Sequence, residues 1–194
     1  MLRIQHRIND AARLRDTPPD QGVEMDIHGY GARLVVHHEA GVDAIDFEAW
    51  LEEYRHAFLI ANVKEEGIER RVRDLLVERG IDRFVMLDLS FPALMKMVRA
   101  GESRVAVRVS EYEPAGGALR LAGRAAWVWL DCFEGGLPIP ASEIRRMAGA
   151  GLKICLVSPE LHGRDAGEID AMAAQLRDAD IAVDAVCTKY PERW

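Results

Sequence analysis

Apolar and polar residues alternate along the chain in an order that predicts strands separated by helices. Short, nearly continuous apolar runs are typical of buried strands, and the helical stretches show an apolar stripe or a capping residue. The predicted strands are residues 2–8, 22–28, 34–36, 58–64, 83–89, 104–109, 126–132, 152–157 and 181–187. The predicted helices are residues 11–16, 46–56, 68–79, 91–100, 140–150 and 168–178, with a weak helix or loop at 115–123.

This β-then-α order predicts an α/β fold with a parallel sheet covered by helices. About eight such units favour a compact (β/α)8 TIM barrel. Its helices and loops must be trimmed, because 194 residues fall short of the roughly 250 of a typical barrel. The chain has no glycine-rich phosphate loop, which disfavours a doubly wound nucleotide-binding fold. We therefore expect a single domain spanning residues 1–194.

The stretch 22–39 contains the most informative polar residues of the chain. Glu24 and Asp26 stand two positions apart inside an apolar run, so both side chains project from the same face of a strand. A Gly-Tyr-Gly turn then returns the chain, which can bring His37 or His38 back towards the two acids. Two buried carboxylates need a cation or a donor nearby. Acids, histidines and a cation are together the components of a metal-assisted hydrolytic site.

Polar residues also follow the predicted strands at the end where a barrel enzyme keeps its chemistry. We expect a pocket at these strand ends, although strands also end in polar loops for no functional reason. The candidates after the first three strands are His6, Arg7, Glu24, Asp26, Asn62 and Lys64. The candidates from the later strands are Asp88, Arg108, Glu111, Trp129, Asp131, Glu160 and Lys189.

Composition narrows the classes of partner. A net charge of −7 argues against a general binder of nucleic acid or of anionic membranes, and no stretch is long and apolar enough to span a bilayer. The three cysteines lack metal-ligand spacing and lie in or beside apolar runs, which fits a reducing cytoplasm. The N-terminus shows no secretion signal. We expect a cytoplasmic protein with a small-molecule substrate, with a homodimer as an alternative to a monomer.

The order of these motifs resembles the glycerophosphodiester phosphodiesterase family, a group of barrels related to phosphatidylinositol-specific phospholipase C. The resemblance covers the whole chain in outline, but its specific motifs lie mostly in the first third. The matching motifs are His6-Arg7, Glu24-x-Asp26, Val36-His37-His38-Glu39, Asn62-x-Lys64 at the end of the strand at 58–64, and Thr188-x-x-Pro191. The chain departs from the family pattern at Ile8, where a glycine is usual, at Asn62, where an acid is usual, and at Glu39, where an aspartate is usual.

The resemblance implies a divalent cation, Mg²⁺ or Ca²⁺, held by Glu24, Asp26 and Asn62. Oxygen ligands without sulfur are what such hard cations take. Asn62 offers a neutral amide oxygen, so we expect weaker metal affinity than a site with three carboxylates provides. Arg7 and Lys64 would bind the phosphate oxygens. The alternative without a metal is that Arg7 and Lys64 form salt bridges to the two acids.

The resemblance also implies acid–base catalysis by two histidines, with His6 as the base and His38 as the acid. Displacement at phosphorus removes one proton and delivers another, and two imidazoles with pKa values near neutrality can do both. A lone histidine is more often structural, and we expect that of His28, His56 and His162.

The expected function is metal-dependent hydrolysis of a small soluble phosphodiester that resembles a glycerophosphodiester or carries a sugar or polyol. The alternative is a non-catalytic barrel that binds a phosphorylated ligand or a protein partner, and Asn62 at the usual acidic position motivates it. A barrel isomerase or aldolase is the third hypothesis. It would require a Schiff-base lysine, for which Lys64 is the only early candidate.

Overall fold

The computed structural model describes all residues, 1–194, and the chain divides into two compact units. The N-terminal unit comprises residues Gln5–Gly101, and the C-terminal unit comprises Met1–Ile4 together with Glu102–Trp194. The expectation of one domain over the whole chain stays a prediction. No helix of the chain has the length and apolar character needed to cross a membrane.

The N-terminal unit is built on three parallel strands in the order β5-β4-β2. Its strands are β2 (Gly22–Tyr30), β3 (Arg33–Val36), β4 (Phe58–Val63) and β5 (Phe84–Leu87). Its helices are α1 (Ala11–Asp16), α2 (Phe47–Glu53), α3 (Glu69–Glu78) and α4 (Phe91–Arg99). The parallel register pairs Asp26 of β2 with Asn62 of β4, which brings two predicted site residues onto neighbouring strands.

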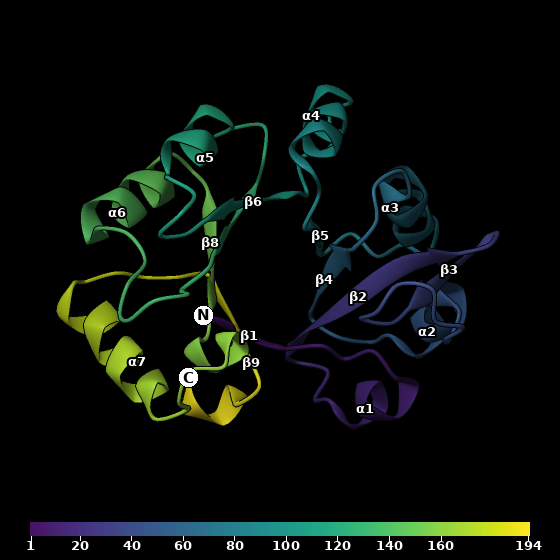
Figure 1. Cartoon of the computed structure of the whole chain (residues 1–194), viewed down its shortest axis with the longest axis horizontal. Helices are drawn as coiled ribbons and strands as arrows, with labels where there is room; N and C mark the ends of the chain where they lie inside the picture. The colour runs from purple at the N-terminus through teal and green to yellow at the C-terminus, as the bar shows by residue number, and fades with distance from the viewer. The chain divides into compact units, whose positions relative to one another are not determined.

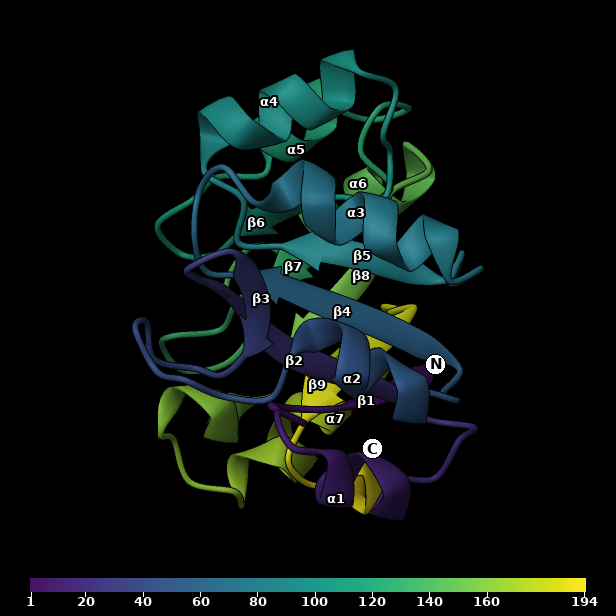
Figure 2. The ribbon, with the colours of Figure 1, turned by 90° about the vertical axis from the view of Figure 1, so that its right-hand side faces the viewer.

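The predicted hairpin after the acidic pair is present. Strand β3 folds back antiparallel along β2, and α2 lies beside it (Figures 1 and 2). Tyr30 pairs with Arg33, so the turn consists of Gly31 and Ala32 and lies one to two residues later than the predicted Gly-Tyr-Gly turn. Gly31 has φ of 58°, a left-handed conformation that glycine adopts without steric cost.

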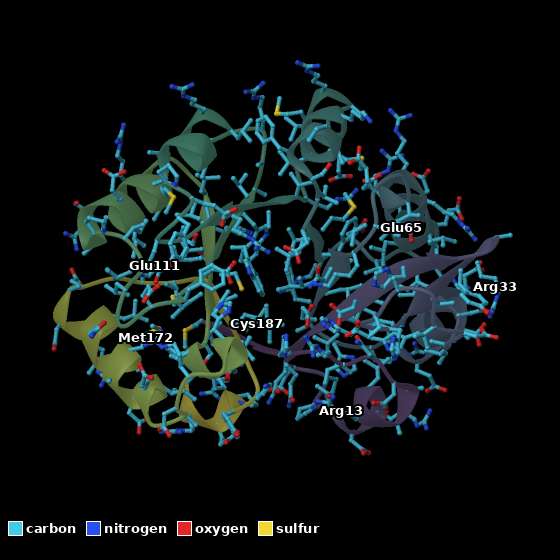
Figure 3. The ribbon with its side chains drawn as sticks, in the orientation of Figure 1. Arg13, Arg33, Glu65, Glu111, Met172 and Cys187 are labelled. Carbon is cyan, nitrogen blue, oxygen red and sulfur yellow. The ribbon has the colours of Figure 1, made fainter.

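The C-terminal unit contains strands β6 to β9, which pair in parallel in sequence order, with β1 next to β9. The strands are β1 (Leu2–Gln5), β6 (Ala106–Val109), β7 (Trp127–Leu130), β8 (Lys153–Val157) and β9 (Ala185–Thr188). The helical elements are α5 (Gly116–Arg120), α6 (Ala141–Gly149), η1 (Pro159–His162), α7 (Glu168–Asp178) and η2 (Pro191–Arg193). Its core packs the inner faces of α6 and α7 against β7 and β8, and includes Met172, labelled in Figure 3.

The predicted succession of β/α units is confirmed along the chain. Eight strands, all except the hairpin strand β3, are each followed by a helical element, as a (β/α)8 fold requires. The first strand ends at Gln5 rather than at Ile8, because Arg7 adopts a left-handed conformation with φ of 55° that no strand accommodates. The last strand begins at Ala185, four residues later than its apolar run at 181, because its pairing with β8 begins at Ala185.

Trp50 links the core of the N-terminal unit to the loop that follows β1. Its side chain is fully buried on α2, and its Nε1 donates to the carbonyl oxygen of Ile8 over 3.1 Å.

We expect Trp50→Phe to lower the free energy of unfolding by about 2 kcal/mol, because it leaves a buried carbonyl without its donor and a small cavity beside it. Thermal unfolding would show a fall of about 4–8 °C in Tm. Tyr54→Phe is the control, because it keeps the ring that stacks on Trp50; an equal fall in both variants would contradict the assignment.

Candidate functional site

Two buried carboxylates form the centre of the candidate site. Glu24 and Asp26 on β2 are each 1% exposed. The Glu24 carboxylate accepts hydrogen bonds from Asn62 Nδ2 over 2.9 Å and from the backbone N–H of Arg7 over 2.7 Å. Burial and the neighbouring Asp26 charge raise the pKa of Glu24 to about 7, although these two donors act in the opposite direction.

Asp26 is surrounded by donors on both of its oxygens. Its Oδ2 accepts from Asn9 Nδ2 over 2.8 Å, and lies 3.3 Å from His38 Nδ1 and 3.6 Å from Arg7 Nε. Its Oδ1 lies 3.4 Å from Lys64 Nζ. Two cations, a histidine and an amide therefore compensate the cost of burying this charge.

The loop after β1 is held against β2 by backbone and side-chain bonds. The N–H of Ile8 donates to the carbonyl of Glu24 over 2.7 Å, and Arg13, labelled in Figure 3, donates from α1 to the carbonyl of Arg7 over 2.9 Å. Arg7 adopts a conformation that costs a non-glycine residue roughly 1–3 kcal/mol. In this conformation its N–H bonds Glu24 while its guanidinium lies beside Asp26, so one residue contacts both acids.

Both predicted catalytic histidines lie next to the acids. His6 Nε2 is 3.7 Å from Glu24 Oε2, and His38 Nδ1 is 3.3 Å from Asp26 Oδ2. Arg7 Nη2 lies 3.3 Å from His38 Nε2. The same Nε2 lies 3.6 Å from Glu39 Oε1, so a donor and an acceptor both face it, while Nδ1 faces Asp26. His37 instead bonds the backbone of Glu39, so only one of the two adjacent histidines contacts the acids, as predicted.

Lys64 lies between a carboxylate within β2 and one that directly follows β5. Its Nζ lies 3.1 Å from Asp88 Oδ2 as well as 3.4 Å from Asp26 Oδ1. Asp88, expected only as a pocket residue, has φ of 60°. A pocket of about 190 Å³ opens beside this pair and is also lined by Glu66 and Ser90. Figure 3 labels Glu65 in the same loop, which accepts from the N–H of Gly29.

The donor set of this cluster fits a hard cation with few protein ligands. No group of three or more histidine, cysteine, aspartate or glutamate side chains in the chain is arranged to hold a metal ion. Asn62, however, donates to Glu24 and stands opposite Asp26 on the neighbouring strand, and its Oδ1 is buried and accepts no hydrogen bond. Two carboxylates and an unpartnered amide oxygen are ligands of the type that Mg²⁺ and Ca²⁺ bind.

The predicted pocket residues of the later strands gather around two other carboxylates, within the C-terminal unit. Asp131, which is 2% exposed, accepts from Trp129 Nε1 over 3.1 Å and lies 3.0 Å from His162 Nε2 and 3.3 Å from Arg108 Nε. Trp129 and Asp131 therefore project from the same face of their strand, as their spacing predicts.

Glu160 is the second of these carboxylates and serves as a hydrogen-bond acceptor. It accepts from Thr188 Oγ1 over 2.7 Å and from the backbone N–H of Lys189 over 2.8 Å, so the main chain of Lys189 rather than its ammonium makes the contact. Glu111, labelled in Figure 3, accepts from the backbone N–H groups of Phe133 and Glu134 and so orders a loop.

Comparisons with solved structures identify the fold over the whole chain. A glycerophosphodiester phosphodiesterase from Agrobacterium tumefaciens matches with a TM-score of 0.64 and 14% identity, over 100% of this chain and 98% of that one. A glycerophosphoryl diester phosphodiesterase from Parabacteroides distasonis matches with a TM-score of 0.70 and 10% identity, over 99% of this chain and 84% of that one. The fold is that of the glycerophosphoryl diester phosphodiesterases. No sequence profile of a protein family and no curated protein sequence matches the chain.

The phosphodiesterase fold confirms the expected α/β class and the compact (β/α)8 barrel. Within it, two side chains with contacts to the acids were missed by sequence reasoning. Asn9 binds Asp26, and His162, expected to be structural, contacts Asp131. Asn9 follows the His-Arg pair by two residues, which is the only sequence signal that could have indicated it. No local pattern links His162 to an acid 31 residues earlier.

Proposed function

We propose that the chain is a metal-dependent phosphodiester hydrolase that acts on a small soluble diester, such as a glycerophosphodiester or a sugar or polyol phosphodiester. The observation that carries the proposal is the cluster of Glu24, Asp26 and Asn62 with a histidine beside each acid. The phosphodiesterase fold of the whole chain supports the same reaction class.

Glu24, Asp26 and the Oδ1 atom of Asn62 would hold Mg²⁺ or Ca²⁺. When bound, the cation supplies Lewis-acid polarisation of a phosphoryl oxygen. The raised pKa of Glu24 leaves part of the carboxyl protonated near neutral pH, so proton release accompanies binding and affinity increases as the pH rises from 5 to 8. Two acids instead of three predict weaker binding than an all-carboxylate site provides.

Arg7 and Lys64 are placed to bind the phosphate and to balance the charge that develops on its oxygens. Both are side chains with solvent access, 45% and 22% exposed, whereas the acids beside them are buried. A ligand can therefore reach the two cations from solvent. Donors fixed in advance around a developing charge lower the barrier of such a displacement.

His6 and His38 would transfer the two protons of the reaction, His6 from the attacking hydroxyl and His38 to the leaving group. Asp26 holds the His38 ring through Nδ1, as a carboxylate orients a catalytic histidine. His38 can act as the acid when Nε2 carries a proton. That atom now faces Arg7, so a phosphate that draws the guanidinium away would also free Nε2 for this proton.

A non-catalytic barrel that binds a phosphorylated ligand is the second candidate function. The neutral Asn62 favours it, because no third carboxylate completes the cluster and Asp26 already has two cations beside it. In that case Arg7 and Lys64 would bind the phosphate, and neither histidine would matter to turnover.

Hydrolysis of a panel of phosphodiesters separates the two functions. The panel contains glycerophosphodiesters and an aryl diester, each assayed with Mg²⁺, Ca²⁺, Mn²⁺ or chelator. We expect turnover only with metal, and a loss of about a hundredfold or more in kcat/KM for His6→Ala and for His38→Ala. His37→Ala is the matched control, because the adjacent ring contacts only the Glu39 backbone. Metal-independent binding of a phosphate ester without turnover would favour the second function.

A further inference from the structure

The loop residue Asn9 makes a two-point contact with Asp26 that none of the motifs includes. Its Nδ2 donates to Asp26 Oδ2 over 2.8 Å, and its Oδ1 accepts from the backbone N–H of Asp26 over 2.9 Å. Both bonds are near the usual hydrogen-bond length, and the side chain is partly buried. One amide therefore binds the main chain and the side chain of the same residue, which restricts rotation of the Asp26 carboxylate.

The backbone of Asn9 is held by the residues on both sides of it. Ile8, which precedes it, is 1% exposed, and its carbonyl accepts from Trp50. The next residue, Asp10, caps helix α1 by accepting from the N–H of Arg13 over 2.8 Å. Asn9 thus stands between a buried residue and a helix cap, which hold its backbone beside Asp26.

The contacts of Asp26 with Asn9 determine which of its two oxygens faces each of the other partners. With Oδ2 facing Asn9 and His38, the remaining oxygen, Oδ1, is directed at Lys64. Asn9 is the closest of the four side chains around the carboxylate and the only one with neither a charge nor a titrating ring. Glu24 has the matching arrangement, with Asn62 donating to one oxygen and leaving the other to Arg7 and His6.

We propose that Asn9 is the positioning residue of the site, which holds Asp26 so that Oδ2 orients His38 while Oδ1 stays available to Lys64 and to the cation. This inference rests on the proposed function for the roles of His38 and the cation. The contact of Asn9 with Asp26 is independent of that function. Partners behind a metal ligand typically change metal affinity or activity by about 10–100-fold when they are replaced.

The test compares Asn9→Asp with Asn9→Ala. The aspartate variant keeps the shape and the acceptor for the Asp26 N–H, but it loses the donor to Oδ2 and places a like charge there. We expect both variants to remain folded, to bind Mn²⁺ about tenfold more weakly by calorimetry, and to lose about 10–100-fold in kcat at a KM within about threefold of the parent value. Gln5→Ala is the matched control, because it removes a hydrogen bond to Gln21 near the same loop and touches neither acid.

Unchanged Mn²⁺ affinity and kcat in Asn9→Asp would overturn the proposal. If the parent protein binds Mn²⁺ but hydrolyses no diester, the proposed function fails while the affinity comparison still decides the role of Asn9. If the parent binds no metal, thermal unfolding of Asn9→Ala, Asp26→Asn and the double variant decides. A double variant that loses less Tm than the sum of the single losses supports the contact, and additive losses refute it.

Discussion

In the Glu24→Gln variant we expect turnover to fall about a thousandfold while the stability of the protein relative to the parent increases as the pH rises to about 7. The loss of activity follows because Glu24 is a proposed ligand of the cation and the neighbour of His6. The gain in stability follows because Glu24 is a buried carboxyl whose pKa is raised to about 7 from a usual 4.5. Ionisation of this group therefore opposes folding.

The raised pKa of Glu24 makes the folded parent protein less stable as the pH rises. Between about pH 4.5 and 7 the folded protein holds a proton on Glu24 that the unfolded chain has released, so the free energy of unfolding decreases as the pH rises through this window. The full loss, reached above pH 7, is about 3 kcal/mol. A neutral amide at position 24 does not titrate, so the variant gains relative to the parent as the pH rises.

Thermal unfolding in chelator at several pH values between 4 and 8 measures this difference. Chelator is required because a bound cation would stabilise only the parent. We expect the Tm difference between variant and parent to increase steadily from pH 4.5 and to level off above pH 7. Asp88→Asn is a matched control at a carboxyl that contacts Lys64 and is partly exposed. A Tm difference that is constant across this range would show that Glu24 does not carry the shifted proton.

The Asn62→Asp substitution is expected to strengthen metal binding and to destabilise the metal-free protein. With the cation present, a third carboxylate raises the ligand charge, and we expect the affinity for Mg²⁺ or Mn²⁺ to increase about tenfold or more. In chelator, the same substitution removes the hydrogen bond to Glu24 Oε1. It also places a second carboxylate within hydrogen-bond distance of that oxygen, where the two like charges repel. We expect a cost of about 2 kcal/mol and a fall of about 4–8 °C in Tm.

Calorimetric titration with metal and thermal unfolding in chelator test the two consequences separately. Asn62→Ala is the control, because it removes the unpartnered Oδ1 without adding charge, and we expect weaker metal binding in it than in the parent. If Asn62→Asp bound metal no more tightly than the parent, Asn62 would not face the cation, and the binding function without catalysis would gain support.

The order of the elements and the chemical type of the site could be predicted from the amino-acid sequence alone. The spacing of apolar residues reflects the local periodicity of strands and helices. It therefore predicted the β/α succession that the structure contains. The two-residue period of a strand placed Glu24 and Asp26 on one face, and the glycine turn brought the following strand back along them. Both relations involve residues close in sequence, where backbone geometry alone fixes which side chains are neighbours.

The contacts between residues distant in sequence, and the roles that depend on them, could be seen only in the folded chain. Asn9 reaches Asp26 across 17 residues and His162 reaches Asp131 across 31, and no periodicity relates such pairs. The guanidinium of Arg7 lies beside the His38 ring, and Arg7 leaves strand β1 in a left-handed conformation that the sequence does not indicate. Burial depends on the whole packed unit in the same way, so only the folded chain shows that the pKa of Glu24 is raised to about 7.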